Sequence, residues 1–143
     1  MSQYVVDASV AAKWFLPEAY ADDAQRLIDN NDDLFSPELM FHEMTSVMLK
    51  RVRRDGMPDE RARGALAMLP FVVRPVSASH LAGMAMDIAI RYDRSAYDAA
   101  YVALAIDRGC RLVTADRRLY NALASSDLAS TMLWIEDVPV PTN

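Results

Sequence analysis

The chain has 143 residues, of which 52% are hydrophobic, and this size suits one globular domain spanning residues 1–143. One cysteine excludes an internal disulfide, and with only two histidines the chain lacks the thiolate and imidazole set of a zinc site. Charged residues interrupt the apolar stretches well short of the roughly 18 residues that a membrane-spanning helix needs. We therefore expect a cytoplasmic protein that does not bind a membrane.

The net charge of −5 disfavours nucleic-acid binding, but the acidic residues are concentrated at the start of the chain. Residues 1–33 carry seven acidic and two basic side chains, whereas residues 34–143 carry thirteen of each. Arg117 and Arg118 directly follow Asp116, so a local basic rim is compatible with the acidic total. An ordinary solvated helix face explains each arginine about equally well.

Hydrophobic periodicity predicts strands and helices in alternation. The expected strands cover residues 3–6, 34–36, 71–76, 111–114 and 132–135. The expected helices cover residues 10–15, 18–31, 38–54, 58–69, 79–92, 95–108 and 117–124. We expect Pro37 in the first turn of the helix at 38–54, with Ser36 as its cap, and Pro70 at the end of the helix before the strand at 71–76. No hairpin dipeptide joins paired apolar runs, so the pattern favours a mainly parallel central sheet with helices on both faces.

The unit from Ser95 to Asp116 places a carboxylate at each end of a helix, turn and strand. Ser95 is a suitable cap for the helix, and Gly109 suits the left-handed residue that ends it. Asp98 lies in the first helical turn, and Asp116 follows the strand. In open α/β sheets, ligands bind beyond the carboxyl ends of the strands, so Asp116 is expected at that edge.

Four carboxylates are candidate site residues: Asp7, Glu43, Asp98 and Asp116. Each also has a structural explanation. Asp7 and Asp116 can cap the helices that follow them, and Asp98 can complete a capping box with Ser95. Glu43 lies on the apolar face of its helix, where a salt bridge to an arginine is the structural alternative.

Taken together, the four acids indicate a cation site. Asp7 and Asp116 directly follow strands, and Asp98 opens a helix that leads into one of these strands. Carboxylates brought close together repel one another unless a cation neutralises them, and all-oxygen ligands suit Mg²⁺ or Mn²⁺. Such an ion polarises phosphodiesters and activates water. Ser9 and Thr114 stand two residues from Asp7 and Asp116, so they are candidates to support these ligands.

Several motifs in this order make the chain resemble the PIN domain family, and more narrowly the VapC toxins of toxin–antitoxin pairs. The motifs are Asp7-Ala8-Ser9, Pro37-Glu38-Leu39 with Glu43, Tyr97-Asp98-Ala99 with Tyr101 to Ala105, and Leu112 to Arg118. The resemblance implies a three-layer α/β/α fold and a ribonuclease that depends on Mg²⁺ or Mn²⁺. It implies that Asp7, Glu43, Asp98 and Asp116 are the catalytic metal ligands, supported by Ser9 and Thr114, and that the protein is a homodimer inhibited by a small antitoxin. We further expect Arg117 and Arg118 to bind the RNA substrate.

One position departs from the family pattern, because Ser46 stands where the family often has asparagine.

Two other functions are compatible with the residues. The first is a PIN-like binding module without catalytic activity. The second is an aspartate-based phosphoryl-transfer domain, although Asp7-Ala8-Ser9 lacks the second aspartate of the common phosphatase motif and no lysine follows a late strand.

Overall fold

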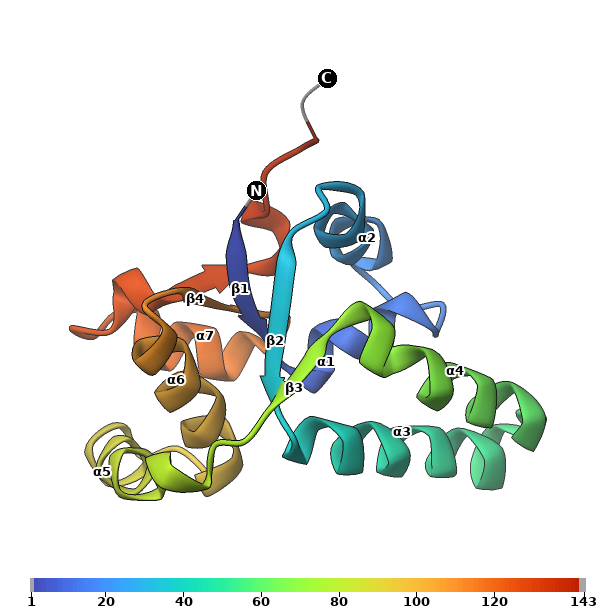
Figure 1. Cartoon of the computed structure of the whole chain (residues 1–143), viewed down its shortest axis with the longest axis horizontal. Coiled ribbons are helices and arrows are strands. Elements are labelled where there is room, and N and C mark those ends of the chain that lie inside the picture. The colour runs from blue at the N-terminus through green and yellow to red at the C-terminus, as the bar shows by residue number, and fades with distance from the viewer. Residues whose placement is uncertain (1, 142–143) are drawn as a thin grey trace.

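A five-stranded parallel sheet forms the centre of the structure, a computed structural model in which residues 2–141 are described (Figure 1). Its strands are β1 (Gln3–Val6), β2 (Asp33–Pro37), β3 (Arg74–Val76), β4 (Arg111–Thr114) and β5 (Met132–Trp134). They lie in the order β3-β2-β1-β4-β5, and each neighbouring pair is parallel. The strand order therefore reverses between β1 and β4, which is where open parallel sheets bind ligands.

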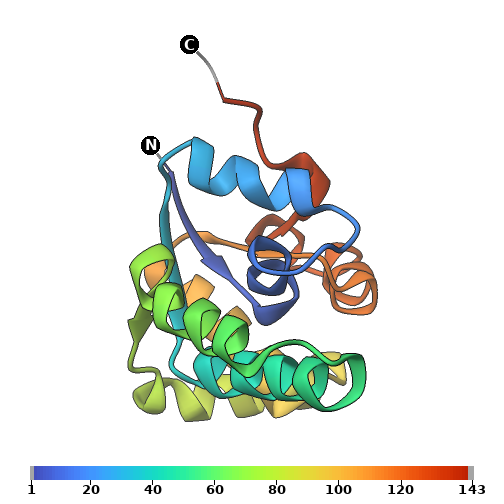
Figure 2. The same cartoon turned by 90° about the vertical axis from the view of Figure 1, so that its right-hand side faces the viewer.

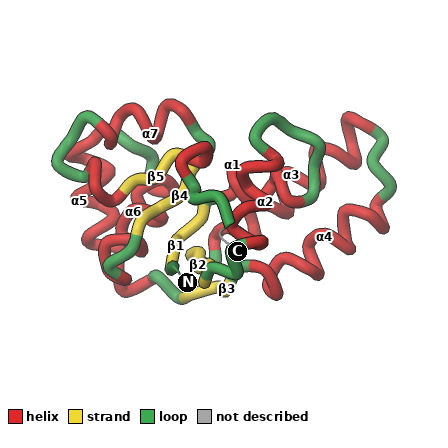
Figure 3. The backbone as a smooth tube through the Cα atoms, turned by 90° about the horizontal axis from the view of Figure 1, so that it is seen from above, coloured by secondary structure: helices red, strands yellow, loops and turns green. Residues whose placement is uncertain are grey.

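Helices cover both faces of the sheet and complete three layers, as Figure 3 shows. One face carries α1 (Ala8–Ala11), α2 (Ala21–Asp29), α3 (Leu39–Asp55) and α4 (Asp59–Val72). The other face carries α5 (Ala82–Tyr92), α6 (Ala96–Arg108) and α7 (Arg117–Ala124). This division follows from right-handed crossovers on the two sides of β1. The three-layer α/β/α fold and the parallel sheet expected from the sequence are confirmed.

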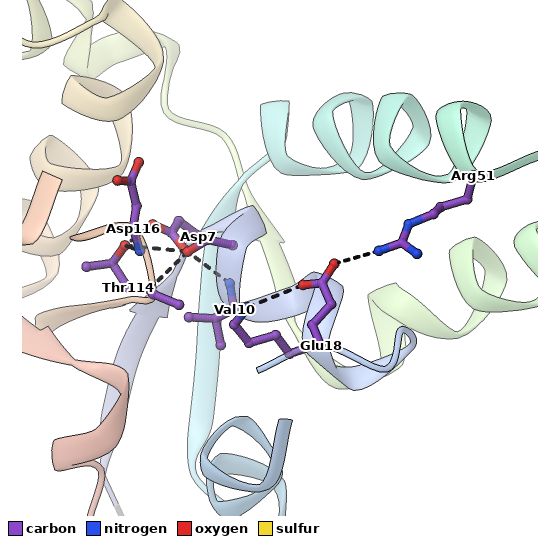
Figure 4. Close-up of polar contacts among 9 residues, drawn as sticks. Asp7, Val10, Glu18, Arg51, Thr114 and Asp116 are labelled. Carbon is purple, nitrogen blue, oxygen red and sulfur yellow. Dashed lines mark hydrogen bonds and ion pairs between the residues drawn. The ribbon is translucent and has the colours of Figure 1, made fainter. Parts of the chain in front are cut away.

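The helices α3 and α4 form a long antiparallel pair that projects from the sheet (Figure 2). An ion-pair network ties the C-terminal part of α3 to the segment that follows α1. Glu18 Oε2 lies 3.0 Å from Arg51 of α3, and Glu18 Oε1 lies 3.2 Å from Lys13, in the 3₁₀ turn that continues α1 (Figure 4). No helix within residues 2–141 has the length and apolarity needed to cross a bilayer.

The unit from Ser95 to Asp116 matches its prediction. The Ser95 hydroxyl accepts a hydrogen bond of 3.0 Å from the Asp98 amide at the start of α6. Gly109 ends α6 with φ 65°, a left-handed conformation that glycine adopts without strain. The strand β4 then runs directly to Asp116.

The structure corrects the expectations at the two prolines. Pro37 is the last residue of β2 rather than part of a helix, and Ser36 is a buried strand residue rather than a cap. The helix α3 begins at Leu39 instead. Pro70 does not end α4, which continues for two residues to Val72, so the proline costs one intrahelical hydrogen bond in the last turn. The strand expected at 71–76 therefore begins only at Arg74.

Three other elements are shorter than their predicted ranges. The helix expected at 18–31 begins at Ala21, since Tyr20 has φ 67° and Glu18 pairs with Lys13 and Arg51. The helix expected at 10–15 is the short α1, followed by the 3₁₀ turn Ala12–Trp14. At the other end of the chain, β5 stops at Trp134 because residues 135–137 form a 3₁₀ turn.

The helix α3 allows a stability test with a matched control. Met44 is fully buried next to Glu43, whereas Leu49 on the same helix is 43% exposed. We expect Met44→Ala to lower the free energy of unfolding by about 2–5 kcal/mol, since it leaves a cavity in the core. Leu49→Ala should cost less than about 1 kcal/mol. Urea unfolding followed by circular dichroism measures both, and equal losses would show that α3 does not pack as described.

Candidate active site

Asp7 is a buried carboxylate at the carboxyl end of β1. Only 6% of the residue is exposed. Its Oδ1 accepts hydrogen bonds from Ser9 Oγ at 2.5 Å and from the Val10 amide at 3.3 Å, and its Oδ2 accepts one from Thr114 Oγ1 at 2.5 Å. The Val10 bond makes Asp7 the cap of α1, as the structural explanation predicted. A charged group can stay buried only with such partners.

Ser9 and Thr114 connect Asp7 to the end of β4. The Ser9 hydroxyl accepts a hydrogen bond of 3.0 Å from the Ala115 amide, and the Thr114 hydroxyl accepts one of 3.0 Å from the Asp116 amide. Figure 4 shows Thr114 and Asp116 beside Asp7. Each hydroxyl therefore donates to Asp7 and accepts from the loop that carries Asp116, which supports the proposed role of these two residues.

Asp116 caps α7 and keeps part of its carboxylate free of backbone bonds. Its Oδ1 accepts hydrogen bonds from the Arg118 amide at 3.0 Å and the Leu119 amide at 3.3 Å. The predicted cap is confirmed. A carboxylate has about four lone-pair sites on two oxygens, so two amide bonds to one oxygen leave room for a further ligand.

Glu43 lies in the second turn of α3 and is half-buried. Its Oε1 accepts a hydrogen bond of 2.6 Å from the Tyr101 hydroxyl of α6. The alternative of an arginine salt bridge is not found, because no ion pair within the described residues includes Glu43. Burial raises the pKa of Glu43, the Tyr101 hydrogen bond lowers it, and the charge of Asp98 raises it further.

Asp98 is half-buried in the first turn of α6. Burial raises its pKa, and the negative charge of Asp116 raises it further. Arg94 and Ser95 lower the pKa, but they only partly offset these effects. A neighbouring charge acts this way only over short distances, so Asp98 and Asp116 lie close enough to repel each other.

The four carboxylates form one electrostatically connected set. Asp116 raises the pKa of both Asp7 and Asp98, and Asp98 raises that of Glu43. These couplings agree with the expected gathering of Asp7, Asp98 and Asp116 at one sheet edge, and the role of the four acids as metal ligands stays a prediction. The four carboxylates do not form a closed metal-binding site, since residues 2–141 contain no preformed group of three acidic, histidine or cysteine ligands for a metal ion.

The two arginines next to the carboxylates differ in their surroundings. The Arg117 guanidinium lies over the Trp134 ring, 3.7 Å from its centroid, which is a cation–π contact. The Arg118 side chain is exposed at the first turn of α7. Both lie beside Asp116, and their contact with RNA stays a prediction.

Sequence reasoning missed Tyr101 as a member of this site. The residue is only 3% exposed, yet its hydroxyl reaches Glu43. One signal was present, because Tyr101 follows Asp98 by three positions and such residues share a face of a helix. Its partner in α3 could not be predicted, since periodicity does not show which helices meet.

The family is shown by sequence comparison. The sequence profile of the PIN domain matches residues 4–123, which include all four carboxylates. The chain therefore belongs to the PIN domain family.

Its relatives include several ribonucleases of the VapC group. Ribonuclease VapC3 of Pyrobaculum aerophilum is 31% identical over 118 residues, covering 80% of this chain and 90% of the relative. Ribonuclease VapC9 of Mycobacterium tuberculosis is 36% identical over 116 residues, covering 80% and 87%.

Solved structures share the fold. PAE2754 of Pyrobaculum aerophilum superposes with a TM-score of 0.71 at 22% identity, covering 95% of this chain and 93% of that one. VapC20 of Mycobacterium tuberculosis, a sarcin–ricin loop cleaving toxin, superposes with a TM-score of 0.62 at 22% identity, covering 78% and 87%.

The raised pKa of Asp7 predicts how the stability of the metal-free protein depends on pH. Burial, offset in part by Ser9, Thr114 and Val10 and reinforced by Asp116, raises its pKa from 3.8 to about 6. The folded metal-free protein therefore binds a proton more tightly than the unfolded chain. Between about pH 4 and 6, the contribution of Asp7 to stability falls as the pH rises, and at pH 7 the ionised group costs about 2–3 kcal/mol.

We therefore expect Asp7→Asn to stabilise the metal-free protein at pH 7 and to remove this part of the pH dependence. Urea unfolding at pH 4, 5, 6 and 7 in the presence of a chelator measures the effect. Asp87→Asn on the exposed side of α5 is the control and should change little. A lower stability of Asp7→Asn at pH 7 would contradict the burial argument.

Proposed function

We propose that the chain is a metal-dependent endoribonuclease that cleaves RNA phosphodiester bonds and acts as the toxin of a toxin–antitoxin pair. The observation that carries the proposal is the meeting of Asp7 and Asp116 at the switch point of the sheet, with Asp98 and Glu43 electrostatically coupled to them. Membership of the PIN family and the relatives named ribonuclease support it. We expect action in the cytoplasm, where the RNA is, through a single domain formed by residues 1–143.

The donor set fits Mg²⁺ or Mn²⁺, and metal dependence is general among PIN-domain nucleases. All four side chains are carboxylates, and three of them have a raised pKa because of burial and mutual repulsion, which a cation would relieve. Mg²⁺ often binds through one or two carboxylates and keeps several waters, so it does not require a closed cage. We assign Asp7, Glu43, Asp98 and Asp116 as the ligands.

The protein residues contribute position and charge to the reaction. A bound divalent cation would polarise the phosphodiester and lower the pKa of a water molecule. The Asp7 carboxylate accepts three hydrogen bonds, so it does not have to reorganise when substrate binds. Ser9 and Thr114 fix it relative to Asp116. Arg117 and Arg118 lie at the same edge, and we propose that they bind the phosphate groups of the RNA backbone.

We also propose two protein partners, a second copy of the chain and a small antitoxin. The relatives named VapC support both through the family to which they belong. Exposed apolar side chains on α5 and α6, namely Met86, Ile90 and Tyr97, support burial against another protein surface.

The phosphoryl-transfer alternative gains no support from the structure. The chain has two lysines. Lys13 pairs with Glu18, and Lys50 is exposed on α3. The alternative of a silent binding module differs from the proposal only in activity, so substitution of the acids separates the two.

Substitution of the carboxylates tests the proposal. We expect Asp98→Asn and Asp116→Asn to lower Mg²⁺- or Mn²⁺-dependent cleavage of RNA by about 100-fold or more, since each removes charge from the cation site. Cleavage of a labelled single-stranded RNA is followed on a gel with identically purified proteins. Asp87→Asn serves as the control and should cleave normally. Cleavage by the site variants at the wild-type rate would identify a contaminating nuclease and refute the assignment.

A separate binding experiment tests Arg118. We expect Arg118→Gln, in an Asp98→Asn background that prevents cleavage, to weaken the binding of single-stranded RNA. The slope of the logarithm of the binding constant against the logarithm of salt concentration is negative, and its magnitude should decrease by about 0.7, the value for one lost phosphate contact. Fluorescence anisotropy at several salt concentrations measures this. Arg63→Gln on α4, where Arg63 pairs with Asp59, is the control and should leave the slope unchanged. An unchanged slope for Arg118→Gln would exclude a phosphate contact by this residue.

A further inference from the structure

The hydroxyl of Tyr101 is placed where two layers of the fold meet. Tyr101 lies on α6, which packs against β1, β2 and β4, whereas Glu43 lies on α3 of the opposite layer. The hydrogen bond of 2.6 Å between them therefore crosses the sheet edge at which the other carboxylates gather.

Burial makes this contact specific. Tyr101 is 3% exposed, so its ring is held by the core and the hydroxyl has little freedom of direction. Glu43 is half-buried on a helix face that otherwise packs apolar side chains such as Met40 and Met44. A carboxylate in that place needs a donor, and no cation within the described residues pairs with it.

The geometry also separates the two oxygens of Glu43. Tyr101 donates to Oε1, which leaves Oε2 without a hydrogen-bond partner among the described residues and able to bind a cation. Tyrosine is suited to this task because it is a neutral donor, so it orients the carboxylate without cancelling the charge that attracts a metal ion. An arginine at the same place would orient the carboxylate but would also cancel its negative charge.

Asp98 and Tyr101 are three residues apart on one helix, so α6 supplies one carboxylate of the site and holds another. We propose that Tyr101 is a positioning residue that fixes the Glu43 carboxylate, relative to Asp98, for binding of the divalent cation. This inference rests on the proposed function, because it assumes that the four carboxylates bind a metal ion. Groups that orient metal ligands in this way commonly change metal affinity by 10–100-fold.

The test is the Mn²⁺ affinity of Tyr101→Phe, measured by isothermal titration calorimetry without RNA. We expect a loss of roughly 10–100-fold, while thermal unfolding shows a folded protein. RNA cleavage by the variant should fall at low Mn²⁺ concentration and recover largely when Mn²⁺ is raised, because the chemical groups remain in place. Tyr4→Phe is the matched control, since Tyr4 is also buried but lies at the start of β1, and it should bind Mn²⁺ normally.

A double-mutant cycle with Glu43→Gln separates positioning from a general effect on the fold. Because Tyr101 acts through Glu43, Tyr101→Phe should add little further loss of Mn²⁺ affinity in the Glu43→Gln background. Full additivity, or wild-type affinity of Tyr101→Phe, would overturn the inference alone. A wild-type protein that binds no Mn²⁺ would overturn the proposed function and this inference with it.

Discussion

The buried carboxylate of Asp7 is the constraint on which the rest of the site depends. Two of its hydrogen bonds come from Ser9 and Val10 directly after β1, and the third comes from Thr114 at the end of β4. The third bond exists only if these two strands are neighbours in the observed register. That register pairs Val6 with Val113, which brings the next residues, Asp7 and Thr114, into contact. The packing of the sheet and the assembly of the site are therefore one requirement, because an unsatisfied Asp7 would destabilise the fold.

Capping a helix and binding a cation are compatible roles for these acids. Asp7 and Asp116 cap α1 and α7, and Asp98 lies in the first turn of α6. Each cap uses only part of a carboxylate, and the amides at a helix start stabilise its negative charge. The helix starts thus allow several acids to gather at one edge. Burial, with a smaller contribution from the charge of Asp116, raises the pKa of Asp7 and Asp98, and a cation would relieve both effects.

How much the sequence predicts depends on how local the cause is. Ser95 and Gly109 bound α6 correctly because capping and left-handed glycine are properties of a few adjacent residues. The expectation at Pro37 was wrong because this residue pairs with β3 in the sheet, and the one at Pro70 was wrong because a helix tolerates a proline in its last turn. The strand order and the partner of Tyr101 could not be predicted, since both depend on which distant segments meet. The four acids could be proposed as one site from the sequence because two follow strands, and the carboxyl ends of parallel strands share an edge.

The carboxylates and the exposed arginines at the end of α3 lie on different parts of the fold. Asp7 and Asp116 directly follow strands, whereas Asp98 and Glu43 lie in the first two turns of their helices. Arginines at the end of α3 are partly neutralised, because Arg51 pairs with Glu18 and Asp55. Arg53 and Arg54 remain exposed on the projecting pair of α3 and α4, outside the sheet. Side chains there can change without disturbing the hydrogen bonds of Asp7, because they lie outside the sheet edge that holds its partners Ser9 and Thr114.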